Sequence, residues 1–334
     1  MPQPTICWYF SKDHLERTPS QAVGFSAEQE NTFRREGARL LLDIGTNLSL
    51  RYDTCSTGLV FFHRFYMFHS FSEFNKHVIA CASLFLSGKV EETPKKAKDI
   101  ISEAQRLLKP EEFDAFTSEP KDELLVAERV LLKTIKFDLQ VVHPYPCILK
   151  YAKVFIGDKA RIEKVAQMAW TFINDSYMTN LCLEWEPEVI AVAALYLACY
   201  LVKFKAPDWT GRQPDHLNWW DQFVDNLTPD VLEEICHKIL DSYNETKREE
   251  TKREEEEQLN QAKAQAAARA SAAPPPPPPS ASRSALPPPP PPPPTPSYAP
   301  PPPPPAPSAG RLLPPPPPAG FMTINPKGFP PYPS

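Results

Sequence analysis

One stretch of the sequence decides the fold: VIACASLFL at positions 78–86. It lies in a helical pattern over residues 74–88 that is apolar on nearly every side, which predicts a central, buried helix. A second stretch, VIAVAALYLACYLV at positions 189–202, has the same character about 110 residues later. It is too short to span a bilayer, so both stretches are expected to be core helices and no membrane association is expected.

Further helical segments surround each of the two central helices. Their apolar residues recur at three-and-four spacing, and Ser26 with Gln29 forms a capping-box pattern where the first segment starts. No window alternates strictly between apolar and polar residues, as a half-buried strand would. The predicted fold class is therefore all-α, with two similar five-helix halves. The expected helices are 26–48, 54–68, 74–88, 95–108 and 121–135, then 145–155, 161–179, 187–203, 217–226 and 229–243.

The prolines separate a folded part from a tail. The chain contains 43 prolines, and about half of the residues from 274 to 334 are proline. Such a segment favours polyproline II and cannot form a helix or sheet core. Before it, a charged five-residue repeat begins at Glu245, and its i,i+4 ion pairs predict an exposed, frayed helix. The expected organisation is an N-terminal segment over 1–25, five-helix halves over 26–140 and 141–244, a charged and alanine-rich helix over 245–273, and a disordered proline-rich tail over 274–334.

Several classes of function find no support in the residues. The glycines are too far apart for a phosphate-binding loop, and the net charge of −5 does not suit nucleic acid. The seven cysteines form no CxxC pair, which is typical of reduced thiols in an intracellular protein. The histidines show no ligand pair in an HExxH setting. We therefore expect no catalytic residues, no cofactor and no metal site.

Several motifs in a fixed order resemble the cyclin box of transcription-associated cyclins. They are RREGA at 34–38, HRFYMF at 63–68, GKVEETPKK at 88–96 and KFDL at 136–139. The aromatic entry segment CWYF at 7–10 agrees with that family. EETP at 91–94, QMAWTF at 167–172 and EWEPE at 184–188 are most similar to the subfamily that activates kinases of the twelve/thirteen type. The resemblance covers roughly residues 7–245 and implies two tandem five-helix cyclin-box folds.

The resemblance also implies a kinase-binding surface. In the family, a lysine that ends the third helix and a glutamate on the fifth helix hydrogen-bond backbone groups of the kinase. The matching residues here are Lys89 and Glu128, whose side chains donate and accept as that task requires. Matching apolar residues would form the buried core of the interface. They are Leu86, Leu132, Phe137 and Leu139.

One motif departs from the pattern of the cell-cycle cyclins. Those proteins carry an MRAIL-type patch that docks substrate peptides, whereas this chain has FRREG at 33–37, with a charge and a glycine in place of the two aliphatic residues. This docking groove is therefore not expected here.

By resemblance, the chain is a nuclear, non-catalytic subunit that activates a transcriptional cyclin-dependent kinase of the twelve/thirteen type. That kinase would phosphorylate the C-terminal repeats of RNA polymerase II during elongation. The alternatives are a partner of the ninth-type kinase, a TFIIB-like transcription factor, or a cytoplasmic adaptor whose function lies in its proline-rich tail. The proline runs are either ligands for SH3, WW or profilin domains or a semi-rigid spacer.

Overall fold

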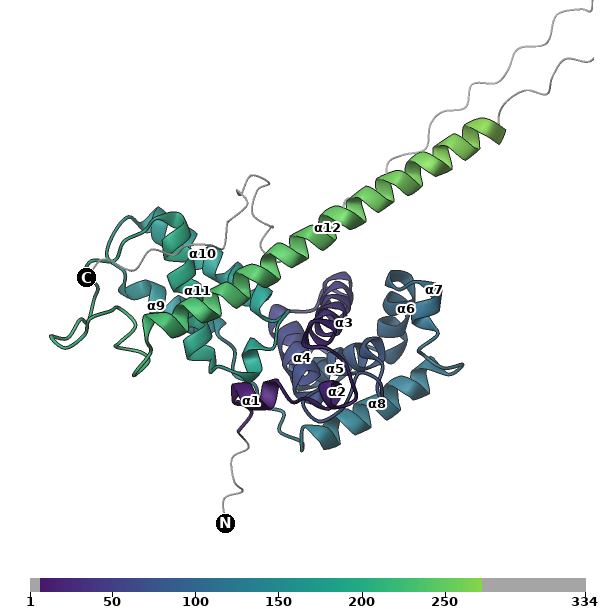
Figure 1. Ribbon diagram of the computed structural model, residues 1–334, viewed down its shortest axis with the longest axis horizontal. Helices are drawn as coiled ribbons and strands as arrows, with labels where there is room; N and C mark the ends of the chain where they lie inside the picture. Colours follow the sequence, from purple (N-terminus) through teal and green to yellow (C-terminus); the bar gives the residue numbers. More distant parts are fainter. Residues whose placement is uncertain (1–6, 272–334) are drawn as a thin grey trace, which may run out of the picture. The chain divides into compact units, whose positions relative to one another are not determined.

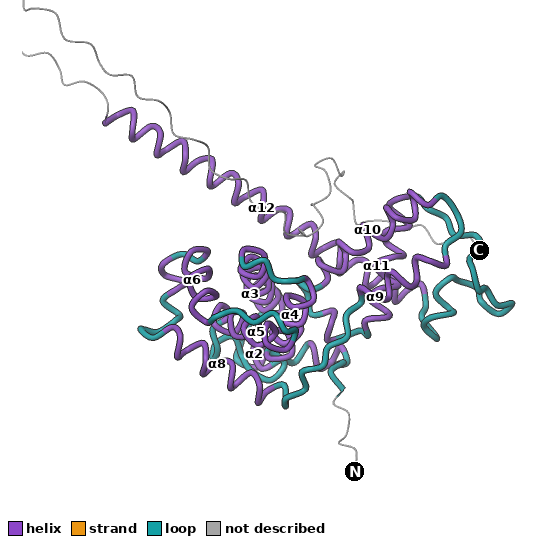
Figure 2. The backbone as a smooth tube through the Cα atoms, turned by 180° about the vertical axis from the view of Figure 1, so that it is seen from behind, coloured by secondary structure: helices purple, strands orange, loops and turns teal. Residues whose placement is uncertain are grey.

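The computed structural model describes residues 7–271 and shows helices joined by loops in this range (Figures 1 and 2). The predicted proline-rich tail, 274–334, lies outside the described residues. No β-sheet forms between residues 7 and 271, where a single isolated bridge pairs Phe155 with Trp209. In the same range, no helix has both the length and the apolar character that crossing a membrane requires.

The first half of the molecule is a bundle built around α5 (Lys76–Val90), which is the central helix that the sequence predicts. Helix α5 is buried from His77 to Gly88 and packs against four other helices (Figure 1). Two close approaches rely on glycine, because a Cβ at Gly37 would lie 2.3 Å from the ring of Phe62 and one at Gly45 would lie 2.4 Å from the sulfur of Cys55. The surrounding helices are α3 (Ala27–Asn47), α4 (Tyr52–Phe65), α6 (Ala97–Leu107) and α8 (Pro120–Thr134).

The second half repeats this plan around α11 (Pro187–Val202), which is buried from Val189 to Cys199. Helix α11 packs against α9 (Tyr145–Tyr151) and α10 (Lys159–Ser176). The thiol of Cys236, on α12 (Pro229–Ser271), lies 3.5 Å from the carbonyl oxygen of Ala193 on α11. The shorter helices of the described chain are α1 (Lys12–Leu15), α2 (Pro19–Ala22), α7 (Pro110–Phe113), η1 (Ala152–Val154) and η2 (Leu181–Leu183).

The predicted helix over 217–226 is wrong, because this segment forms successive turns. The carboxylate of Asp221 accepts hydrogen bonds from the backbone N–H groups of Leu217 and Asn218, at 2.9 and 2.7 Å. Such local bonds compete with helical pairing. The indole of the buried Trp220 donates to the carbonyl of Leu227 at 3.1 Å, which fixes the segment against the core.

The two helices expected over 229–243 and 245–273 are one continuous helix, α12 (Pro229–Ser271). No glycine or proline lies between them, and the charged repeat consists of good helix formers, so the sequence contains nothing that would end the first helix. The residues through Thr246 belong to one compact unit, and the rest of α12 belongs to a second. In that second unit the described side chains, such as Glu255 and Leu259, are exposed, as the sequence predicts.

Four core helices end in the same way. After α3, α5, α8 and α11, a left-handed residue is followed by one whose N–H bonds the carbonyl five positions earlier, as in a Schellman motif. The left-handed residues are Ser49, Glu92, Lys136 and Lys203, and none of them is glycine. After α8 the next residue, Phe137, is left-handed too, with φ of 58°. Within residues 7–271 this is the one place where two successive residues have positive φ.

The N-terminal segment connects the two halves. Trp8 is buried and packs edge-on against Phe68 of the first half, with 6.1 Å between ring centroids. Two residues later, the N–H of Phe10 donates to the carbonyl of Leu183 in the second half, at 2.7 Å. Lys12 then pairs with Glu234 on α12. Residues 8–12 therefore contact both halves of the described chain.

Candidate functional site

The two charged residues that the sequence singles out meet on the surface of the first bundle. Lys89 lies in the last turn of α5 and Glu128 in the middle of α8. The ammonium of Lys89 donates to both carboxylate oxygens of Glu128, at 2.6 and 2.9 Å. The Lys89 side chain is 46% exposed, whereas that of Glu128 is 9% exposed. The glutamate is thus held in place while the lysine still faces solvent.

The ring of Phe85 is a neighbour of this pair that the sequence analysis did not identify. The ammonium of Lys89 lies 4.0 Å from the centroid of the ring, a cation–π distance. Phe85 precedes Lys89 by four positions on α5, so helical spacing was the signal that could have indicated this contact.

The four apolar residues expected around the pair do not all lie at the surface. Leu132 is half-buried one turn beyond Glu128 on α8, and Leu139 is half-buried after the helix. Phe137 is 66% exposed, and its backbone N–H bonds the carbonyl of Leu132 at 3.0 Å. Leu86 lies in the core with 4% exposure, so it offers almost no area to a partner. Phe137 is therefore the most accessible apolar group of the set.

The FRREG segment on α3 has its charges engaged inside the molecule. Arg34 is 1% exposed and donates to Glu30 at 2.7 Å. The neighbouring Arg35 pairs with Glu245 on α12. Glu36 pairs with Lys76 at 3.1 Å. All three charges of this segment are therefore paired within the described chain.

Two buried histidines connect the bundles. One nitrogen of His63 pairs with the backbone carbonyl of Tyr177 at 2.8 Å, and burial together with Arg34 lowers the pKa of His63 to about 3. His143 pairs with the hydroxyls of Thr57 and Tyr177, both at 2.8 Å, and burial lowers its pKa to about 4. Within the described residues, no group of histidine, cysteine, aspartate or glutamate side chains could hold a metal ion.

We expect the folded state to lose stability as the pH falls below about 6.5, the usual pKa of histidine in an unfolded chain. Below that pH the unfolded chain binds protons that neutral, buried His63 and His143 do not bind until about pH 3 and 4. Between pH 7.5 and 5.5 the free energy of unfolding should fall by about 1.4 kcal/mol for each histidine, because the unfolded histidine is still only partly protonated in most of this range. Urea titrations between pH 7.5 and 5.5 measure this dependence, and His143→Gln should reduce the total loss by about 1.4 kcal/mol, the share of one histidine. An unchanged slope in that variant would contradict the assignment.

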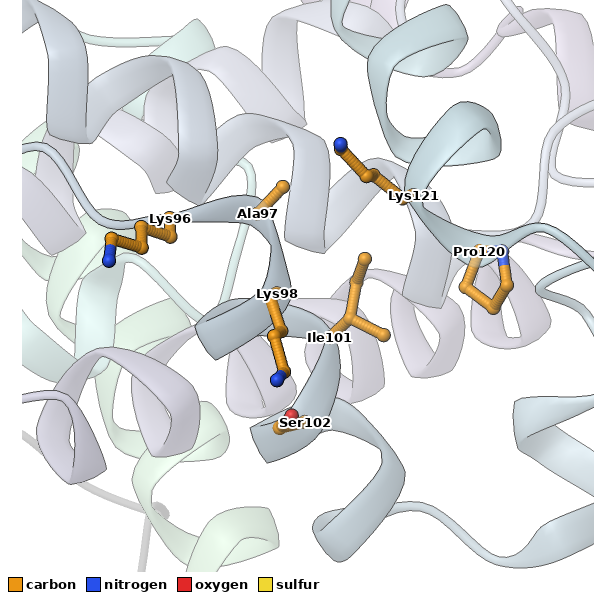
Figure 3. A pocket seen from close by; sticks show the side chains of 7 residues that line it. All are labelled: Lys96, Ala97, Lys98, Ile101, Ser102, Pro120 and Lys121. Atoms are coloured by element: carbon orange, nitrogen blue, oxygen red, sulfur yellow. The ribbon is translucent and has the colours of Figure 1, made fainter.

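A shallow pocket lies elsewhere on the first bundle, where α6 and α8 begin (Figure 3). Figure 3 shows Lys98 of α6 and Lys121 of α8 around Ile101. Neither Lys89 nor Glu128 lines this pocket. The candidate site is therefore an exposed surface suited to a macromolecule rather than a cavity for a small ligand.

Two family models match the chain, one after the other, and together they cover the two bundles. The model "Cyclin, N-terminal domain" matches residues 5–140, and "Cyclin-T2-like, C-terminal domain" matches residues 145–241. The chain belongs to the cyclin family. The two bundles of this cyclin correspond to these two domains, which confirms the tandem cyclin folds expected from the sequence.

Curated relatives identify the subfamily that this cyclin is similar to. It is 56% identical to cyclin-K of Homo sapiens, over 73% of this chain and 42% of that protein. It is 54% identical to cyclin-K of Danio rerio, over 72% of this chain and 56% of that protein. Identity to human cyclin-T2 is 32%, over 72% of this chain and 32% of that protein. The chain thus spans about half or less of the length of these relatives. The motifs EETP, QMAWTF and EWEPE indicate the cyclin-K subfamily, and the higher identity to cyclin-K than to cyclin-T2 confirms this.

Solved structures share the fold of this cyclin at low sequence identity. A chain of the yeast RNA Pol II CTD kinase CTDK-1 complex superposes with a TM-score of 0.54 at 21% identity, over 70% of this cyclin and 72% of that chain. A chain of the yeast TFIIK (Kin28/Ccl1/Tfb3) complex gives a TM-score of 0.52 at 19% identity, over 70% and 96%. These similarities concern the fold alone.

Proposed function

We propose that this cyclin is a non-catalytic regulatory subunit that binds and activates a cyclin-dependent kinase acting in transcription. The observation that carries the proposal is the Lys89–Glu128 pair, which joins α5 to α8 and leaves the lysine half-exposed. Leu132 and the exposed Phe137 extend the same surface with apolar area. Charge-assisted donors and acceptors beside an exposed aromatic ring are what a specific protein interface needs at its centre.

Binding would activate the kinase by shifting its conformational equilibrium. A partner that contacts the αC helix and the activation segment stabilises the arrangement in which the catalytic lysine–glutamate pair of the kinase is formed. The cyclin binds this active arrangement better than the inactive one, so the population of active kinase rises. No reacting group is required from the cyclin itself.

The finer assignment is a kinase of the twelve/thirteen type that phosphorylates the C-terminal repeats of RNA polymerase II in the nucleus. It is supported by the identity to cyclin-K, which exceeds half of the aligned residues. The engaged charges of the FRREG segment support a second part of the proposal, namely that substrates are selected by the kinase or by another surface. The proline-rich tail, in this proposal, adds binding sites for partners without being needed for activation.

Deleting residues 247–334 is expected to leave kinase activation unchanged, because among the described residues the compact unit that contains Lys89 and Glu128 ends at Thr246. The measurement is phosphorylation of a polymerase-repeat peptide by the twelve-type kinase domain, with the 334-residue chain and with the shortened cyclin. The ninth-type kinase domain serves as a comparison. If neither version bound or activated either kinase domain, the proposed function would be overturned. Loss of activation only in the shortened version would favour the adaptor alternative.

A further inference from the structure

The indole of Trp8 contacts two side chains from α4 and the turn after it, and its N–H donates a hydrogen bond to a third residue. The guanidinium of Arg64 lies 4.5 Å from the centre of the Trp8 ring, and Phe68 meets the ring edge-on. The indole N–H donates to the carboxylate of Asp138 at 2.8 Å, across 130 positions of sequence. Trp8 is 5% exposed, so this hydrogen bond is shielded from competing water.

Asp138 follows the two left-handed residues at the end of α8. Lys136 and Phe137 have φ of 53° and 58°, a conformation that non-glycine residues adopt only when their surroundings hold them. The backbone N–H of Asp138 also bonds the carbonyl of Ile135 at 2.9 Å. Both the backbone and the side chain of Asp138 are thus fixed directly after the strained pair. The turn presents Phe137 with 66% of its surface exposed.

Arg64 adds an electrostatic reason for Asp138 to stay in place. It is 8% exposed, and its Nε and Nη1 atoms lack a hydrogen-bond partner within the described part of the chain. The carboxylate of Asp138 is among the negative groups that oppose the effect of burial on the pKa of Arg64. Trp8 therefore lies over a buried cation and directs its own N–H to a carboxylate that this cation attracts.

We propose that Trp8 is a positioning residue for the kinase-binding turn: through Asp138 it holds residues 136–139 in the conformation that presents Phe137 to the kinase. This inference rests on the proposed function, because it assigns Phe137 to the interface. It gives the N-terminal aromatic segment a role in partner binding in addition to its packing. Preorganisation of this kind raises affinity because the turn need not be ordered on binding.

The test measures the affinity of the 334-residue chain for the twelve-type kinase domain by titration calorimetry. Trp8→Phe keeps an aromatic ring over Arg64 but removes the indole donor, and Asp138→Ala removes the acceptor. Each is expected to weaken binding about tenfold, which is about 1.4 kcal/mol. Asp138→Asn keeps an acceptor oxygen but loses the attraction to Arg64, so its affinity should lie between those of the parent and Asp138→Ala. Lys12→Ala breaks an exposed ion pair in the same N-terminal segment and serves as the matched control, with no change expected.

A double-mutant cycle with Phe137→Ala separates positioning from general stability. If Trp8 acts through Phe137, Trp8→Phe has little further effect once Phe137 is alanine. An equal effect in both backgrounds would show a merely structural role and overturn the inference. Parent-like binding by both Trp8→Phe and Asp138→Ala would overturn the positioning role as well. The proposed function would still stand if the Lys89→Ala/Glu128→Ala variant bound the kinase more weakly. Should Trp8→Phe fail to fold, the Asp138→Ala and Asp138→Asn pair decides.

Discussion

Replacing Lys89 and Glu128 together by alanine is expected to weaken kinase binding by about 2–5 kcal/mol, from roughly thirtyfold to several thousandfold. The two side chains lie 2.6 Å apart at the surface of α5 and α8. In a complex both would be charge-assisted hydrogen-bonding groups withdrawn from water, and such groups contribute strongly to the slow dissociation of an interface. Kinase activity should fall in parallel with binding at a fixed cyclin concentration.

The control for this variant is Arg106→Ala. Arg106 pairs with Glu103 at 2.8 Å on α6, in the same bundle, and its side chain is exposed. Loss of this pair should change stability by less than about 1 kcal/mol and leave binding unaltered. Undiminished binding and activation by the Lys89→Ala/Glu128→Ala variant would show that the kinase contacts another surface.

Replacing Arg34 by methionine is expected to lower the free energy of unfolding by about 3–5 kcal/mol. Arg34 is 1% exposed and donates two hydrogen bonds to Glu30, which is itself 3% exposed. It also donates to the backbone carbonyls of His63 and Tyr66 at 3.3 and 3.2 Å. Methionine fills similar space but leaves Glu30 as a buried charge without its cation and two carbonyls without their donor. Urea unfolding at pH 7.5 measures the loss.

The matched variant is Glu30→Gln combined with Arg34→Met. Removing both charges abolishes the uncompensated carboxylate, and the glutamine oxygen can still accept from the hydroxyl of Thr18, which donates to Glu30 at 2.5 Å. We expect the double variant to be more stable than Arg34→Met alone by about 1–3 kcal/mol. If the single variant were as stable as the parent, the buried pair would not contribute to holding α3 against α4.

Most of the fold could be predicted from local patterns. The apolar runs at 78–86 and 189–202 identify the two central helices, and the capping box of Ser26 and Gln29 is present at the start of α3. The segment 217–226 could not be predicted, because its composition permits a helix and only the contacts of Asp221 and Trp220 decide against one. The junction inside α12 was misplaced because a change in composition is not a helix-breaking signal.

The sequence by itself determined that this protein is an all-helical cyclin with two repeated bundles, because hydrophobic periodicity and motif order are local properties that need no partner. The family resemblance also indicated Lys89 and Glu128, by their places at the end of the third helix and on the fifth helix. Only the tertiary structure decided that Leu86 belongs to the core while Phe137 is exposed, and that Trp8 reaches Asp138. These facts depend on contacts between residues up to 130 positions apart. Such contacts form only when helices pack, and no spacing along the chain records them.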